Sequence, residues 1–136
     1  MRDPRVAPAA SVALVDLVLV LVFAVIGRVS HAEDLGFAGM ARTAGPFLAG
    51  WLAGWALVAL VPSTRTRPRS LLAGALVWVA VVVVGMLVRV ATGQGVETSF
   101  VVVTTIVVGV FLLGWRAVAA LVTRGRSRSA SPAAQV

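Results

Sequence analysis

Two charged residues, Asp16 and Arg116, lie inside long apolar stretches of the sequence. A charge at the centre of a membrane helix costs on the order of 2.5–3.5 kcal/mol on insertion scales, and such residues usually face a bundle interior and pair. We therefore expect an ion pair between Asp16 and Arg116. Two alternatives stay open: the carboxylate of Asp16 is protonatable and couples transport, or it is a silent buried acid.

A second set of polar residues, the outer cluster, lies at and beyond the ends of the apolar stretches. It consists of Arg28, His31, Glu33, Asp34, Arg42, Arg89 and Glu97. Guanidinium groups bind phosphate or carboxylate in a bidentate manner, so Arg28 and Arg89 could converge on one anion or on Glu97. The competing interpretation is that these arginines snorkel to the membrane surface. His31 is the only histidine, so we expect no metal, no haem and no other cofactor.

Gly50 and Gly54 form a GxxxG motif, which allows another helix to approach closely. We expect it to serve a tight contact within the chain more than dimerisation. Trp51 and Trp55 share one helix face near the middle of the membrane, away from the interfacial belts where tryptophan is enriched. They could pack as filler or line a cavity for an aromatic or cationic ligand.

Four apolar segments must position these residues. They are predicted as helices over residues 9–27, 44–61, 71–90 and 99–122. Each is close to the roughly 20 residues that a helix needs to cross a bilayer. The segments are too long for typical strands, and in lipid only helices and closed barrels satisfy their backbone. The predicted fold class is therefore all-α, an integral membrane four-helix bundle with short loops and a single domain over residues 9–122.

The composition excludes an ordinary soluble domain and several kinds of chemistry. Of the 136 residues, 60% are hydrophobic and 12% are charged, whereas soluble domains are usually about 25% charged. Cysteine is absent, which excludes disulfides and thiolate catalysis. No nucleophile elbow, phosphate-binding loop or metalloprotease motif occurs, so we do not expect an enzyme.

The distribution of arginine predicts the orientation. Nine arginines are assigned to one side of the membrane: Arg2, Arg5, Arg65, Arg67, Arg69, Arg116, Arg124, Arg126 and Arg128. The other three belong to the outer cluster. By the positive-inside rule both termini are cytoplasmic, in a bacterial plasma membrane. The net charge of +7 then favours anionic lipid headgroups over nucleic acid as a partner.

The ends of the chain are expected to contribute no fold. Residues 1–8 form a short cytoplasmic N-terminus, and the basic residues 123–136 form a disordered cytoplasmic tail. A cleaved signal peptide is the rival interpretation of the first apolar segment. Its length of 18 residues before Gly27 and the presence of Asp16 argue against cleavage.

Boundary residues refine the predicted helices. Ser70 and Ser99 are placed as N-caps of the third and fourth segments, and Pro46 falls in the first turn of the second. Ser30 and Glu33 fit a capping box that would begin a short surface helix.

Several of these residues, in their order and spacing, resemble a known family. They are Asp16, Phe23, Gly27, Arg28, Ser30, His31, Pro46, Phe47, Gly85, Arg89, Thr92, Gly93, Ser99, Phe100, Gly114, Trp115 and Arg116. The chain resembles an actinobacterial family of small membrane proteins, domain of unknown function 3054, over roughly residues 16–116. The resemblance implies a compact four-helix membrane protein and supplies no activity.

Three function classes remain. An accessory or scaffold subunit of a membrane complex is favoured by the small size and the lack of a catalytic motif. The alternative is a homo-oligomeric small-solute or ion transporter that uses Asp16. A lipid- or anion-sensing role of the outer arginines is the third. The expected partners are an anionic bilayer and either a membrane protein or a second copy of the chain.

Overall fold

The computed structural model describes residues 8–130, and this part of the chain is helical with no strand. The helices are α1 (Ala9–Ser30), α2 (Phe37–Leu60), α3 (Pro62–Arg65), α4 (Leu71–Ala91) and α5 (Thr98–Ala130). All but the single-turn α3 are long and apolar enough to cross a membrane. The predicted all-α, four-helix membrane fold is confirmed.

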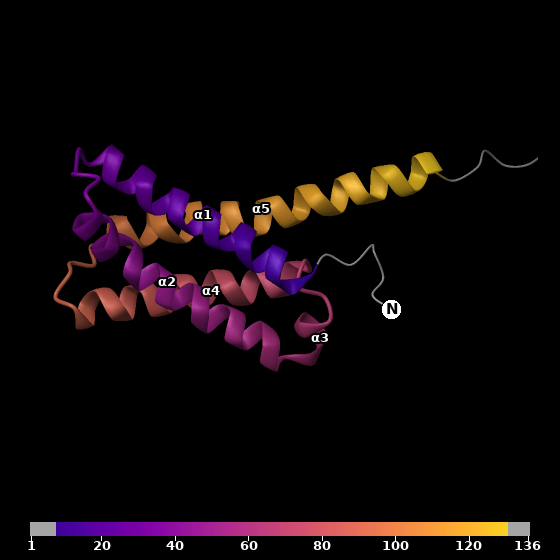
Figure 1. The fold of residues 1–136 in the computed structure, drawn as a ribbon, viewed down its shortest axis with the longest axis horizontal. Helices are drawn as coiled ribbons and strands as arrows, with labels where there is room; N and C mark the ends of the chain where they lie inside the picture. The colour runs from indigo at the N-terminus through magenta and orange to yellow at the C-terminus, as the bar shows by residue number, and fades with distance from the viewer. Residues whose placement is uncertain (1–7, 131–136) are drawn as a thin grey trace, which may run out of the picture.

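The four long helices alternate in direction (Figure 1). We call the end with the start of α1, with α3 and with the C-terminal part of α5 the terminal end, and the opposite end, with the connections 31–36 and 92–97, the loop end. α2 and α4 pack most closely, while α1 packs on α2 and α5, and α4 packs on α5. At 33 residues α5 is about 50 Å long, and it projects well beyond its neighbours at the terminal end.

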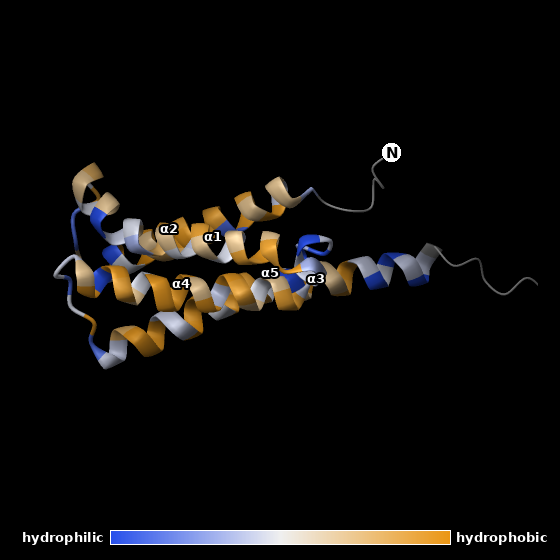
Figure 2. Cartoon of the chain, turned by 90° about the horizontal axis from the view of Figure 1, so that it is seen from below, coloured by the Kyte–Doolittle hydropathy of each residue, from blue (hydrophilic) through white to orange (hydrophobic). Residues whose placement is uncertain are grey.

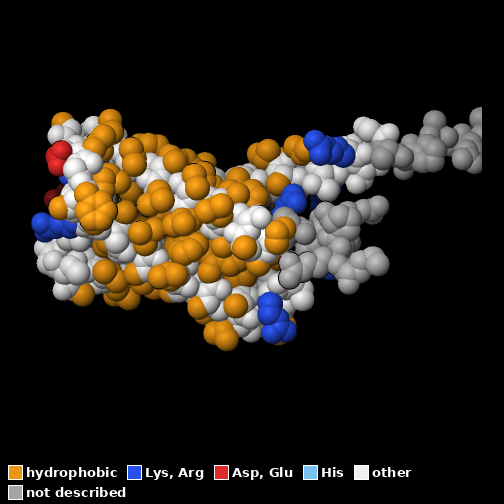
Figure 3. All heavy atoms as spheres, viewed as in Figure 1, with side chains coloured by type: hydrophobic (Ala, Val, Ile, Leu, Met, Phe, Trp, Pro, Cys, Tyr) orange, Lys and Arg blue, Asp and Glu red, His pale blue; other side chains and the backbone are white. Residues whose placement is uncertain are grey.

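Hydropathy follows the same axis. Figure 2 shows apolar residues along the middle of the long helices and hydrophilic residues at the loop end, in α3 and on the projecting part of α5. On the face drawn in Figure 3, hydrophobic side chains form a broad band between charged groups at the two ends. Large apolar side chains are exposed on the outer surface of the helices, among them Leu52 and Leu87, which are both more than 60% exposed. In lipid such a surface is favourable, whereas in water it would promote association.

The core is built where small residues let α2 lie against α4. A Cβ atom added to Gly50 would stand 2.6 Å from Cα of Val81, and one added to Gly54 would stand 2.8 Å from Cα of Val77. The GxxxG motif therefore serves contact within the chain. Phe47, Val77, Val81, Val108 and Leu112 are among the side chains that fill the remaining core.

Several expected boundaries are wrong. α2 begins at Phe37 instead of residue 44, because Ala, Met and Arg in its first turns are good helix formers. Pro46 consequently lies inside α2. Ser30 is the last residue of α1, so the expected capping box does not start a helix there. Ser99 is the second residue of α5, whereas Ser70 does cap α4, its Oγ accepting a hydrogen bond of 3.1 Å from the Ala73 amide.

The tail is also more ordered than expected, because α5 continues through residues 123–130. Extending a helix already formed avoids the cost of nucleation. The hydroxyls of Thr123, Ser127 and Ser129 each donate a hydrogen bond to the carbonyl four residues earlier. The prediction of disorder is therefore wrong for 123–130, while residues 1–7 and 131–136 lie outside the described residues.

Candidate functional site

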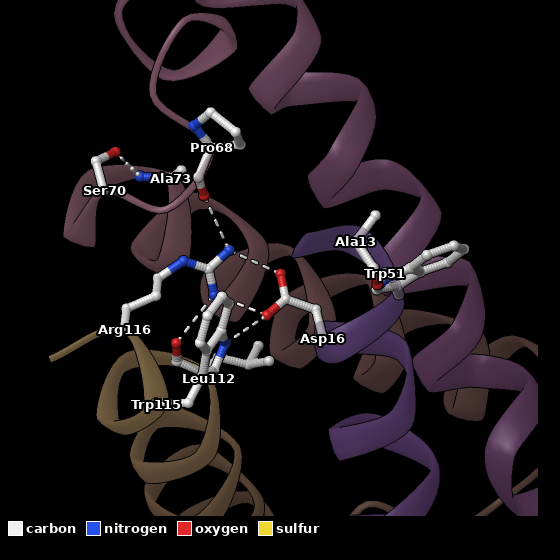
Figure 4. Close-up of polar contacts among 9 residues, drawn as sticks. All are labelled: Ala13, Asp16, Trp51, Pro68, Ser70, Ala73, Leu112, Trp115 and Arg116. Carbon is white, nitrogen blue, oxygen red and sulfur yellow. Dashed lines mark hydrogen bonds and ion pairs between the residues drawn. The ribbon is translucent and has the colours of Figure 1, made fainter. Parts of the chain in front are cut away.

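The structure brings Asp16 and Arg116 together at the crossing of α1 and α5 (Figure 4). Asp16 lies one turn from Val12 and Val20, and Arg116 lies one turn from Leu112, so both belong to the buried stripe of their helix. Arg116 Nη1 donates a hydrogen bond of 2.7 Å to Asp16 Oδ1, and Nη2 donates one of 2.8 Å to Oδ2. The two residues are 0% and 1% exposed. This is a buried, bidentate ion pair.

Further groups complete the pair. Trp115 Nε1 donates a hydrogen bond of 2.9 Å to Asp16 Oδ1. Arg116 Nη1 also donates to the Leu112 carbonyl at 3.0 Å, and Nη2 donates to the Pro68 carbonyl at 3.2 Å. Four of the five guanidinium N–H groups thus have acceptors, while Nε has none among the described residues. Charge-assisted bonds of this kind are roughly twice as strong as neutral ones.

The surroundings of Arg116 explain how a guanidinium fits inside the bundle. A Cβ atom added to Gly74 of α4 would lie only 2.7 Å from Arg116 Cδ, so the absence of a side chain there makes room for the arginine stem. The guanidinium carbon lies 4.8 Å from the centre of the Trp115 ring. The groups that surround the ion pair therefore come from four parts of the fold: α1, the loop before α4, α4 itself and α5.

Arg28 of the outer cluster organises the connection between α1 and α2. Its Nε donates to the Asp34 carbonyl at 2.6 Å, and its Nη1 donates to the Gly39 carbonyl and the Thr43 hydroxyl. Nη1 also lies 2.8 Å from Glu33 Oε2. Because Arg28 is only 9% exposed, it does not snorkel to the surface.

Arg89 plays a similar part in the connection between α4 and α5. Its Nη1 donates to Gln94 Oε1 at 3.0 Å and its Nη2 donates to the Gly95 carbonyl at 2.9 Å. The guanidinium carbon lies 4.4 Å above the centre of the Phe100 ring. Gln94 Nε2 donates to the Arg42 carbonyl at 3.1 Å, which joins this connection to α2. In the described part of the chain neither Arg28 nor Arg89 pairs with Glu97, so that hypothesis is wrong.

The outer cluster nevertheless surrounds one feature, which we call the loop-end cleft. It has a volume of about 1040 Å³, and α1 and α5 form two of its walls. Arg28, His31, Glu33, Arg42, Arg89 and Glu97 line it together with apolar residues that include Phe23, Phe47, Phe100, Val103 and Val107. Asp34, the remaining residue of the cluster, is exposed outside this lining. The spacing of the charged residues alone did not reveal the apolar walls, because these come from three different helices, α1, α2 and α5.

The tryptophans mainly join helices. Trp51 Nε1 donates to the Ala13 carbonyl of α1, and Trp78 Nε1 donates to the Thr105 carbonyl of α5. Trp51 and Trp55 pack at the edge of the core and are not among the residues of the loop-end cleft. This favours packing over a ligand cavity. From the sequence, Trp115 was named only among the residues that carry the family resemblance and was not assigned to the ion pair, although its position beside Arg116 was a usable signal.

Comparison with known proteins places the chain in a family without supplying an activity. A family model described as "Protein of unknown function (DUF3054)" matches residues 13–119. This span contains both members of the buried pair and the whole loop-end cleft. No curated protein and no solved structure matches the chain significantly.

Proposed function

The chain belongs to the DUF3054 family of proteins of unknown function, and we propose that it is an accessory or scaffold subunit of a complex in the bacterial plasma membrane, without catalytic activity of its own. In the proposed orientation both termini are cytoplasmic, as the nine-to-three distribution of arginine indicates. The proposal rests on how Asp16 is held.

The single observation that carries the proposal is that the Asp16 carboxylate is buried and held by three hydrogen-bond donors. Three N–H donors from Arg116 and Trp115 converge on it, and the carboxylate is fully buried. A carboxylate that couples transport must exchange protons or ions during each cycle. Here that exchange would disrupt a bidentate pair and leave the guanidinium buried without its counter-charge, which is strongly unfavourable. The pair is suited to holding α1 and α5 in one arrangement.

The projecting part of α5 supports a scaffold role. About 30 Å of hydrocarbon accounts for some 20 helical residues, so roughly the last 13 of the 33 residues of α5 extend past the membrane on the terminal side. Arg124, Arg126 and Arg128 are exposed on this extension. A helix that continues rigidly out of the bundle presents a basic surface to anionic headgroups or to an acidic partner.

The test is a purification of the tagged full chain, expressed at its natural level, in a mild detergent. We expect a second membrane protein at a fixed stoichiometry, which is reduced when Arg124, Arg126 and Arg128 are all changed to Gln. The matched control changes Arg65, Arg67 and Arg69, three arginines at the end of α3 and in the loop after it, to Gln, and should retain the partner. A stable homodimer without any other subunit would contradict the proposal.

The orientation is tested separately with reporter fusions. A reporter placed after Gln94 should lie outside the cell, and one placed after Val136 should lie in the cytoplasm. Equal signals from the two sites would contradict the proposed orientation. They would not bear on the proposed role as a subunit, which the purification tests.

A homo-oligomeric transporter that uses Asp16 is the second candidate, and the loop-end cleft favours it, since the cleft lies between the same two helices that the pair joins. Reconstitution into proteoliposomes distinguishes the two candidates. Solute or ion flux that is lost in Asp16→Asn would favour the transporter, whereas the absence of flux would favour the scaffold subunit.

A further inference from the structure

The loop-end cleft has the dimensions of a ligand site. Its volume of about 1040 Å³ lies just above the range of roughly 300–1,000 Å³ found for small-molecule pockets. Ile26 of α1 and Val103 of α5 line it and are 48% and 55% exposed. Because these two apolar side chains line the cleft and are also exposed on the surface of the bundle, we infer that the cleft opens toward the lipid between α1 and α5.

The polar mouth of the cleft has an excess of positive charge. Arg28, Arg42 and Arg89 line it against Glu33 and Glu97. Glu33 is paired with Arg28, which leaves Arg42 and Arg89 without a carboxylate within ion-pair distance in the described part of the chain. The side chain of Arg42 is exposed and makes no hydrogen bond there either. Two guanidinium groups near a common opening favour an anion.

The deeper walls of the cleft are apolar, with one exception. Phe23, Phe47 and Val107 form part of the lining on three helices. Thr104 also belongs to the lining, is 0% exposed, and its hydroxyl has no hydrogen-bond partner among the described residues. A threonine inside a helix ordinarily donates to the carbonyl four residues earlier, as the neighbouring Thr105 does to Val101. An unpaired hydroxyl beneath the arginines is therefore available to a ligand group such as an ester carbonyl.

We propose that the loop-end cleft binds an anionic amphiphile from the bilayer, with its phosphate at Arg42 and Arg89 and its acyl chain between α1 and α5. The cleft combines the features that a phospholipid needs: arginines at its mouth, the Thr104 hydroxyl one helical turn beyond Phe100 on α5, and aromatic and valine side chains in its walls. The opening between two membrane helices lets such a molecule enter without leaving the bilayer. A soluble phosphate would use only the mouth and gain nothing from the apolar walls.

The experiment measures lipid binding to the purified full chain in a neutral detergent by native mass spectrometry. The probes are phosphatidylglycerol, phosphatidylcholine with the same acyl chains, and inorganic phosphate. We expect one phosphatidylglycerol per chain, bound roughly tenfold or more tightly than phosphatidylcholine, since a charge-assisted contact to a guanidinium contributes about this factor. Inorganic phosphate at the same concentration should not displace it.

Charge variants test the mouth of the cleft. Arg42→Gln, which removes an exposed side chain with no observed partner, should weaken phosphatidylglycerol binding about tenfold, and Arg42→Gln with Arg89→Gln should weaken it further. The matched control Arg65→Gln with Arg67→Gln removes the same charge from exposed residues at the terminal end and should leave affinity unchanged.

A steric variant tests the apolar part without touching any charge. Val103→Trp fills the opening and should reduce phosphatidylglycerol binding, whereas Val110→Trp, an exposed residue of the same helix outside the cleft, should not. Equal affinity for the two lipids, displacement by inorganic phosphate, or unchanged binding in both Arg42→Gln and Val103→Trp would each overturn the proposal. These outcomes are independent of whether a partner subunit is found.

Discussion

The two ends of the same helix pair differ sharply. At the terminal end α1 and α5 are joined by Asp16 and Arg116, which are completely buried and use almost all of their hydrogen-bonding capacity on each other and on nearby groups. At the loop end the same helices enclose a cleft in which the side chain of Arg42 and the hydroxyl of Thr104 have no partner among the described residues. Arginine side chains thus serve two purposes in this protein. An arginine that is paired with a carboxylate, such as Arg116, holds helices together, whereas an arginine without a carboxylate partner, such as Arg42, is available to a ligand.

Removing one member of the buried pair should have the largest effect. Asp16→Asn leaves the Arg116 guanidinium buried without its counter-charge, so we expect the free energy of unfolding to fall by about 3–5 kcal/mol. Equilibrium unfolding of the detergent-solubilised protein measures it. Adding Arg116→Gln to Asp16→Asn should restore part of the loss, because no charge then remains uncompensated. Strictly additive losses would show that the two residues do not interact.

The next largest effect concerns α2 and α4, which pack tightly against each other, whereas α1 and α5 enclose a cleft. Gly50→Ala places a methyl group against the backbone at Val81, so the helices must move apart, and we expect a loss of about 2 kcal/mol. Gly45→Ala in the same helix is the matched control, because nothing lies within 4 Å of its added Cβ atom. Thermal unfolding of both variants is the measurement. A similar change in the two would argue against close packing at Gly50.

A smaller effect is expected from the indole that completes the pair. Trp115→Phe keeps an aromatic ring beside Arg116 but removes the donor to Asp16, and should cost about 1.5 kcal/mol. Trp55→Phe removes an indole N–H that has no partner among the described residues, and should cost less. If Trp55→Phe proves the more harmful in the same unfolding assay, the assigned role of Trp115 is wrong.

The smallest effects sharpen the contrast between a satisfied and an unsatisfied group. Thr64 and Thr104 are both 0% exposed, but the Thr64 hydroxyl donates to the Val58 and Val61 carbonyls, whereas that of Thr104 is unpaired among the described residues. Thr64→Val should lower the free energy of unfolding by about 1 kcal/mol. Thr104→Val should leave it unchanged or slightly raised, because no hydrogen bond is lost. The reverse order in unfolding measurements would contradict the assigned hydrogen bonds.

Much of the fold was predictable, for reasons that particular residues show. Four apolar segments that are too long for typical strands must be helices in a bilayer, because their backbone must be satisfied internally. The burial cost of Asp16 and Arg116 predicted a pair before any contact was known. Ser70 was correctly placed as a cap because its side chain bonds only to its own first turn.

The errors occurred where local signals compete with continuation of a helix. Pro46 was placed in the first turn of a helix beginning at residue 44, but α2 begins at Phe37 and accommodates the proline in its interior. The basic composition of residues 123–130 suggested disorder, but this segment prolongs a helix that is already nucleated. The composition of a segment does not predict the early start of α2 or the extension of α5, because each depends on helical residues outside that segment.

The sequence by itself determined which segments enter the membrane and which charges had to be paired, because both follow from the cost of placing backbone groups and ions in hydrocarbon. Tertiary structure alone decided that Trp115, Pro68 and Gly74 complete the pair, and that Phe23, Phe47, Phe100 and Thr104 line one cleft with the outer arginines. These residues are far apart in the chain and ordinary in type. They come together only because α1 and α5 cross, with an ion pair between these helices at the terminal end and a cleft between them at the loop end.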